Sequence, residues 1–187
     1  MNSTNKSIRI VGISGSLRRN SYNTALLHAA AKEAPSVQFT VADISRIPFF
    51  NEDIENPYPK SVIELKELIM EADAVVISTP EYNGMISGVL KNTLEWLSRP
   101  QLGQPCSGKP LGIMGVATTM YGTSSAQAQL RQLAFSLNMH ILNRPLVRVG
   151  NASQKFASDG TLTDEQTKEA LKQFMKALID WTNRLLD

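Results

Sequence analysis

The sequence has 187 residues, of which 19 are Lys or Arg and 17 are Asp or Glu, so its formal net charge is only +2. The basic residues are scattered, so the charge suggests no nucleic acid or membrane as a partner, and no apolar run approaches the roughly 20 residues of a membrane span. The length fits one domain over 1–187, and a single cysteine, Cys106, excludes an internal disulfide and fits a reducing, cytoplasmic setting.

The first part of the chain predicts a strand, a loop and a helix. Residues 1–7 are polar and are expected to lack regular structure. Residues 8–13 form a short β-branched run, which indicates a strand, and a loop rich in serine follows over 15–23. An apolar periodic stretch then ends before Pro35, which is typical of a helix.

The next two strands differ in their apolar pattern. Val37, Phe39 and Val41 alternate with polar or small residues, which predicts an edge strand. Residues 74–77 are continuously apolar, which predicts a central strand with both faces covered. A helix is expected between these strands. Its apolar face comprises Val62, Leu65, Ile69 and Ala72.

The second half repeats this alternation and ends in a long helix. A helix near 87–97 and a strand over 111–116 come first, and an alternating strand over 146–149 is the fifth. Thr163 and Gln166 have the spacing of a capping box at the start of the last helix. The helix after the fourth strand carries Leu130, Leu133 and Leu137, and the last one carries Leu171, Phe174, Leu178, Trp181 and Leu185.

Strands that alternate with helices predict an α/β fold with a doubly wound parallel sheet. The five strands suit the order 2-1-3-4-5, with the second and fifth on the edges and helices on both faces. In such a sheet, ligands bind beyond the carboxyl ends of the strands, where the strand order reverses. The loops that begin at Ser14, Thr79 and Ala117 therefore form the candidate site.

The first loop combines hydroxyls, amides and a guanidinium directly before a helix. Free N–H groups and the helix dipole favour an anion there, and the composition suits a terminal phosphate. The loop is neither a G-x-G-x-x-G fingerprint nor a Walker motif. An alternative stays open at this point: Ser21 or Asn20 caps the helix, and the arginines are simply solvated.

The second loop, 79–84, follows the most buried strand and ends in Gly84, which lets backbone approach a ligand closely. Its polar groups could contact the edge of a flat ring. The alternative is an ordinary turn that begins at Pro80 and carries a surface tyrosine.

Together the motifs resemble those of the NADPH-dependent FMN reductases, including quinone, chromate and azo-dye reductases of flavodoxin-like fold. The resemblance runs in order from the first strand to about residue 150. It rests on Gly15-Ser16-Leu17-Arg18 with Ser21 and Asn23, then Pro80-Glu81-Tyr82-Asn83-Gly84, then Leu90-Lys91-Asn92 and Glu95-Trp96.

The resemblance implies bound FMN, with NADPH or NADH as electron donor. The residues implied to hold the FMN phosphate are Ser16, Arg18, Ser21 and Asn23, with Tyr22 flanking them. The residues implied to line the isoalloxazine, mainly through backbone groups, are Pro80, Glu81, Tyr82, Asn83 and Gly84.

The third loop departs from the family pattern. Thr119 and Thr123 stand where glycine is common, and Ser125 stands where an arginine is common. The resemblance carries Ala117, Thr118 and Thr119 over as residues at the far edge of the flavin. A homodimer is implied as well, and the altered loop leaves a tetramer open.

The implied reaction is hydride transfer from NAD(P)H to the flavin and then electron transfer to a quinone, free flavin, azo dye or metal oxyanion. No catalytic side chain is expected, because the flavin performs the chemistry. The chief alternative is a flavodoxin-like electron carrier, against which Arg18 and the mildly basic charge argue. A second is a hydrolase that uses Ser14 or Ser16 as nucleophile, but neither histidine lies at a recognisable spacing.

Two further residues lie outside these motifs. Trp96 lies on an apolar helix face and is expected to pack in the core or, more readily than Trp181, against a second subunit. Cys106 would be redox-sensitive only if it were exposed beside a cation.

Overall fold

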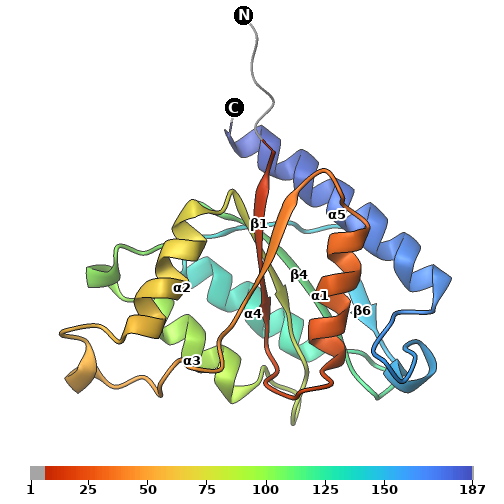
Figure 1. Cartoon of the computed structure of the whole chain (residues 1–187), viewed down its shortest axis with the longest axis horizontal. Helices are drawn as coiled ribbons and strands as arrows, with labels where there is room; N and C mark the ends of the chain where they lie inside the picture. The colour runs from red at the N-terminus through yellow and green to blue at the C-terminus, as the bar shows by residue number, and fades with distance from the viewer. Residues whose placement is uncertain (1–6, 187) are drawn as a thin grey trace, which may run out of the picture.

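A computed structural model describes residues 7–186 as a single α/β unit (Figure 1). Of the stretch predicted to be irregular, residues 1–6 lie outside the described residues, and Ser7 belongs to no helix or strand. The strands are β1 (Arg9–Ser14), β2 (Gln38–Ala42), β3 (Ala74–Ser78), β4 (Pro110–Val116), β5 (His140–Ile141) and β6 (Val147–Val149). The α-helices are α1 (Tyr22–Lys32), α2 (Lys60–Glu71), α3 (Gly88–Leu97), α4 (Ser124–Ser136) and α5 (Glu165–Leu186).

The strands form one parallel sheet in the order β2-β1-β3-β4-β5, which confirms the predicted topology. The prediction of five strands needs one correction. Two short strands share the fifth position, since β5 pairs with the beginning of β4 and β6 pairs with its end. Pro145 lies between them and has no N–H to donate to a ladder, so the edge strand is interrupted there.

Helices cover both faces of the sheet (Figure 1). α1 and α5 pack on one face, and α2, α3 and α4 pack on the other. β3 contributes to both cores, because Val75 and Ile77 face the second group of helices while Ala74 and Val76 face the first. This two-sided burial explains why the sequence of β3 is continuously apolar.

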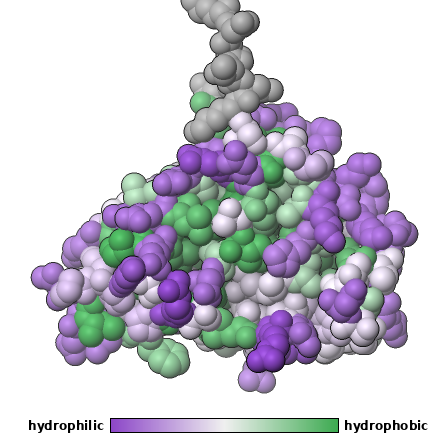
Figure 2. All heavy atoms as spheres, viewed as in Figure 1, coloured by the Kyte–Doolittle hydropathy of each residue, from purple (hydrophilic) through white to green (hydrophobic). Residues whose placement is uncertain are grey.

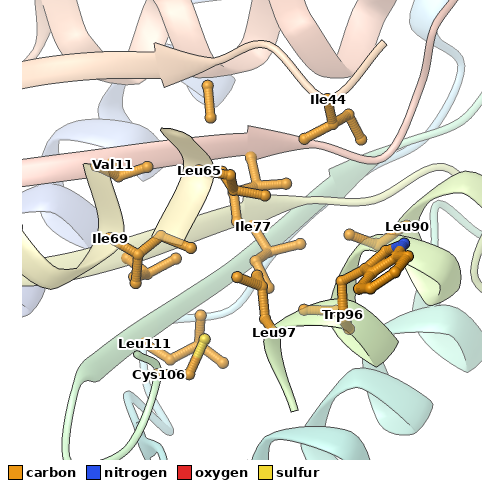
Figure 3. Packing of buried hydrophobic residues seen from close by; sticks show 14 of the residues in the cluster. Val11, Ile44, Leu65, Ile69, Ile77, Leu90, Trp96, Leu97, Cys106 and Leu111 are labelled. Carbon is orange, nitrogen blue, oxygen red and sulfur yellow. The ribbon is translucent and has the colours of Figure 1, made fainter. Parts of the chain in front are cut away.

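The core beneath α2 and α3 contains two residues whose roles the sequence left uncertain (Figure 3). Trp96 is fully buried and its Nε1 donates to Pro48 O at 2.8 Å, so of the two expected environments it has the core. Cys106 lies beside Leu111 in the same core. Burial raises the pKa of the Cys106 thiol to about 12, so it is not a reactive thiolate.

The start of α5 also differs from the prediction. Asp164, not Thr163, is the capping residue, since its Oδ2 accepts from the Thr167 N–H at 2.9 Å. The Thr163 hydroxyl instead donates to Lys155 O at 3.0 Å. Both residue types can cap a helix, and the preceding turn decides which of them does.

The surface is mixed in character. Hydrophilic side chains are spread over the face in Figure 2, with apolar atoms between them in small patches. Within residues 7–186, no helix combines the length and the apolar character that a bilayer crossing requires.

Candidate functional site

The three predicted loops meet at the carboxyl edge of the sheet, which is the lower edge in Figure 1. Backbone hydrogen bonds continue past the strand ends and fix the loops side by side. Gly15 N donates to Ser78 O at 2.8 Å, Thr79 N donates to Met114 O at 3.0 Å, and Ala117 N donates to Val149 O at 2.9 Å. The predicted reversal of strand order between β1 and β3 is therefore where the polar residues gather.

The first loop has the geometry of an anion site. Ser21 is the N-cap of α1, and its Oγ accepts from the Thr24 N–H at 3.3 Å. The capping alternative is therefore correct for Ser21, but it leaves the first-turn N–H groups of Tyr22 and Asn23 free of helical partners. Ser16 Oγ accepts from the Arg18 N–H at 3.3 Å, which forms a local turn within the loop.

The charge of this loop is positive on balance. Residues 14–25 include two arginines and no Asp or Glu. The Arg18 guanidinium lies 5.0 Å from the centroid of the Tyr22 ring, a cation–π contact at the start of α1. Hydroxyls, free amides and guanidinium groups at a helix N-terminus are the donor set that a phosphate requires.

Gly15 allows the first and second loops to pack against each other. A Cβ at this position would lie 2.8 Å from Pro80 Cδ and 3.1 Å from Leu90 Cδ2, so a side chain here would force the loops apart. The Ser87 hydroxyl also donates to Gly15 O at 2.6 Å. Ser87 is in turn the N-cap of α3, so the three elements are positioned together.

Asn23 uses its side chain inside the protein. Its Oδ1 accepts from Val116 N at 3.1 Å and from Ser78 Oγ at 2.9 Å, and its Nδ2 donates to Val116 O at 3.0 Å. The residue is only 4% exposed. The amide therefore ties α1 to the ends of β3 and β4, and Asn23 can reach a ligand at this loop through its backbone N–H.

The second loop is a tight hairpin. Tyr82 and Met85 exchange backbone hydrogen bonds of 3.0 and 2.9 Å. Asn83 and Gly84 form the two-residue turn with φ of 53° and 73°, the left-handed conformation that this pair of residues favours. Tyr82 is exposed at the hairpin, so a rigid backbone edge and an aromatic side chain face solvent together.

Helix α4 holds this hairpin from the side. The Ala126 N–H donates to Glu81 Oε2 at 2.9 Å, so Glu81 caps α4 from another loop. Gln129 Oε1 accepts from Ile86 N at 3.2 Å, and its Nε2 donates to Gly84 O at 3.1 Å. Sequence reasoning missed Gln129, because an amide on a helix carries no signal of a partner more than 40 residues away.

The third loop is attached to the segment that follows β6. Ala117 O accepts from Ala152 N at 3.1 Å, and Thr119 O accepts from Asn151 N at 3.1 Å. Thr118 and Thr119 are exposed. Thr123 is fully buried above Gly115, where a Cβ would come within 2.1 Å of its Oγ1, so this threonine fills core space rather than facing a ligand.

The hydrolase alternative finds no support in the described part of the chain. The hydrogen-bond partners of Ser14 Oγ are Thr24 Oγ1 at 2.8 Å and Ser16 O at 3.5 Å, and neither is a general base. The Ser16 hydroxyl is engaged by the Arg18 N–H. His28 and His140 lie on α1 and β5, so neither belongs to the three loops.

A doubly wound parallel sheet with a phosphate-type loop at its switch point defines a flavodoxin-like protein. Comparison with known protein families, sequences and solved structures narrows this class. The family model described as NADPH-dependent FMN reductase matches residues 8–154, and the chain belongs to that family. It is accordingly an FMN-dependent NAD(P)H oxidoreductase, which confirms the predicted family, enzyme class and cofactors.

Three relatives illustrate the match. An NAD(P)H-dependent FMN reductase of Pseudomonas aeruginosa is 43% identical over 180 residues, 95% of this chain and 97% of that one. An NADPH:quinone oxidoreductase of Arabidopsis thaliana is 39% identical over 186 residues, covering 95% and 93%. The solved structure of FerB, a flavoenzyme NAD(P)H:(acceptor) oxidoreductase from Paracoccus denitrificans, superposes with a TM-score of 0.87 at 31% identity and covers 95% and 98%.

Proposed function

We propose that the three loops hold FMN so that NAD(P)H reduces it and a quinone reoxidises it. The observation that carries this proposal is the packing of the anion-binding loop against the Asn83–Gly84 hairpin, through the contact of Gly15 with Pro80. Because the two loops are packed together, a phosphate on the first and a flat ring on the second would be held at a fixed distance from each other. FMN carries both groups.

The proposed residues fall into three groups. Ser16, Arg18 and Ser21, with the backbone N–H groups of Tyr22 and Asn23, bind the phosphate. The isoalloxazine lies along the backbone edge of Pro80, Glu81, Tyr82, Asn83 and Gly84. Ala117, Thr118 and Thr119 border its far side. These roles follow the family motifs, and the hydrogen bonds around Asn23 assign its side chain to support instead of contact.

When bound, FMN supplies the two-electron chemistry. The protein's own contribution is placement: the anion loop fixes one end of the cofactor, and the hairpin clamped by α4 fixes the other. Quinones are the proposed acceptors because several relatives are named as quinone reductases or oxidoreductases, among them a 2-hydroxy-1,4-benzoquinone reductase at 35% identity.

We also propose that the protein is a homodimer built around this edge and that it works in the cytoplasm. Large apolar side chains are exposed in or beside all three site loops. They are Leu17, Tyr82, Met85, Met120 and Tyr121. Burying them against a second copy would remove apolar surface from water and cover the flavin. Sedimentation of the wild-type chain and of Tyr121→Lys tests this, and a monomeric wild-type chain would contradict it.

The functional proposal is tested by flavin titration and turnover. Arg18→Ala should weaken FMN binding about 10- to 100-fold, because a charged hydrogen bond contributes about 1.5–3 kcal/mol. The neighbouring Arg19→Ala is the matched control and should change FMN affinity little. FMN-loaded wild-type enzyme should oxidise NADPH or NADH when a quinone is present. A chain that binds FMN but oxidises neither nucleotide would instead fit a flavodoxin-like electron carrier.

A further inference from the structure

A large groove continues from the first loop along the outer side of α1. Its volume is about 1020 Å³. One wall is α1 itself, and the opposite wall is the turn 156–162, which Figure 1 shows in blue beside α1. Small-molecule sites are usually about 300–1,000 Å³, so the groove is large enough for a substantial ligand.

The groove lies beyond the phosphate and away from the proposed flavin ring. Its mouth is formed by residues 18–22, of which Arg18, Ser21 and Tyr22 are also proposed to bind the phosphate. None of the residues that line it belongs to the hairpin 80–84 or to 117–119. A ligand in this groove would therefore adjoin FMN at its phosphate and not at its isoalloxazine.

The walls of the groove suit a nucleoside. Ala25 and Ala29 lie one turn apart on α1, and their small side chains leave room in the groove. Phe156 and Leu162 form an apolar floor. The turn is rigid, since Ala157 N donates to Thr161 O at 2.9 Å and Thr161 N donates to Asp159 Oδ1 at 2.8 Å. Asp159 thus presents a carboxylate of the kind that binds ribose hydroxyls.

The mouth carries more positive charge than FMN needs. Arg18 and Arg19 are adjacent, both are exposed, and both line the entrance. One guanidinium suits the single phosphate of FMN, whereas two suit a diphosphate.

We propose that this groove binds the adenylate half of FAD, so that the protein accepts FAD as well as FMN. The flavin phosphate keeps its place on the first loop, the second phosphate lies against Arg19, and the adenosine lies between α1 and the turn 156–162. This proposal rests on the proposed binding of FMN at the first loop. An adenosine phosphate could also come from the electron donor, but the donor's nicotinamide must reach the flavin ring, which the groove does not border.

The test blocks the groove from both walls. Ala29→Trp fills it from the helix, and Ser158→Trp fills it from the exposed turn, where a large side chain leaves the core untouched. Ala31→Trp is the matched control, because Ala31 is a half-buried alanine of the same helix that does not line the groove. FMN and FAD are titrated separately into apoprotein and followed by the quenching of flavin fluorescence.

Wild-type protein should bind FAD within about tenfold of FMN, a difference of about 1.4 kcal/mol or less. Both groove variants should weaken FAD at least about tenfold and leave FMN almost unchanged, and the control should change neither. FAD affinity that survives both variants would overturn the proposal. A raised KM for NADPH in FMN-loaded groove variants, with FAD affinity unchanged, would also overturn it and assign the groove to the donor. Wild-type protein that binds neither flavin would refute the FMN site itself, whereas binding of FMN without FAD would refute the groove alone.

Discussion

Replacing Asn23 by alanine should destabilise the apoprotein strongly, although the residue sits in a ligand-binding motif. The side chain makes three buried hydrogen bonds, two to the backbone of Val116 and one to the Ser78 hydroxyl. Removing it leaves those groups buried without partners, because Ser78 and Val116 are almost inaccessible to solvent. Each of the three groups costs about 1–3 kcal/mol, so the total loss should be about 3–9 kcal/mol.

This loss is large enough to measure without any flavin. For a chain of this size each kcal/mol shifts the Tm by about 2–4 °C, so Asn23→Ala should lower the apoprotein Tm by roughly 6–36 °C. Urea unfolding of apoprotein gives the free energy directly. Asn20→Ala is the control, since Asn20 is an exposed amide of the same loop and should have little effect. If Asn23→Ala left apoprotein stability within about 1 kcal/mol of wild type but abolished FMN binding, the side chain would be a phosphate ligand and the present reasoning would fail.

Four further outcomes are expected. Gln129→Ala should loosen the hairpin and weaken FMN binding about tenfold. Gln132→Ala, on the exposed side of α4, should leave FMN affinity unchanged. Equal FMN affinities in the two variants would show that the Gln129 contacts with the hairpin do not support the site. Gly84→Ala should lower the free energy of unfolding by about 1–2 kcal/mol, because φ at this position is 73° and an added methyl group would make no packing contact within 4 Å. Gly88→Ala, at the start of α3, should be neutral or stabilising. Cys106 should not react with a thiol reagent at pH 8 in the folded protein, because a pKa of about 12 keeps it protonated, and one thiol should appear in denaturant. Initial-rate plots with NADPH and a quinone should give parallel lines, as expected when donor and acceptor use the same flavin face in turn, and intersecting lines would contradict this.

Most of the sheet could be predicted from the sequence because burial leaves a simple pattern. The alternation at Val37, Phe39 and Val41 identified the edge strand β2, and the apolar run over 74–77 identified the central strand β3. β5 could not be found in this way, because a strand of two residues is too short for any periodicity. Its presence depends on pairing with Pro110 and Leu111, which are 30 residues earlier.

The site was predictable where local chemistry determines it and not where distant contacts do. Hydroxyls and an arginine before a helix indicate an anion without reference to the rest of the fold. The role of the Asn23 side chain depends on Val116, which is 93 residues away, and that of Gln129 depends on Gly84. The environment of Trp96 stayed open for the same reason: an apolar helix face does not reveal whether the sheet or a second subunit covers it.

The cap that Glu81 provides to α4 has a consequence for how this site can change. The helix begins where the third loop ends, yet the groups that hold it to the hairpin, Glu81 and Gln129, lie outside residues 117–125. Substitutions at the exposed positions of that loop, such as the threonine at 119, therefore leave these contacts intact. The side chains at 118 and 119 can therefore vary at this edge of the site while the hydrogen bonds that hold the hairpin to α4 are kept.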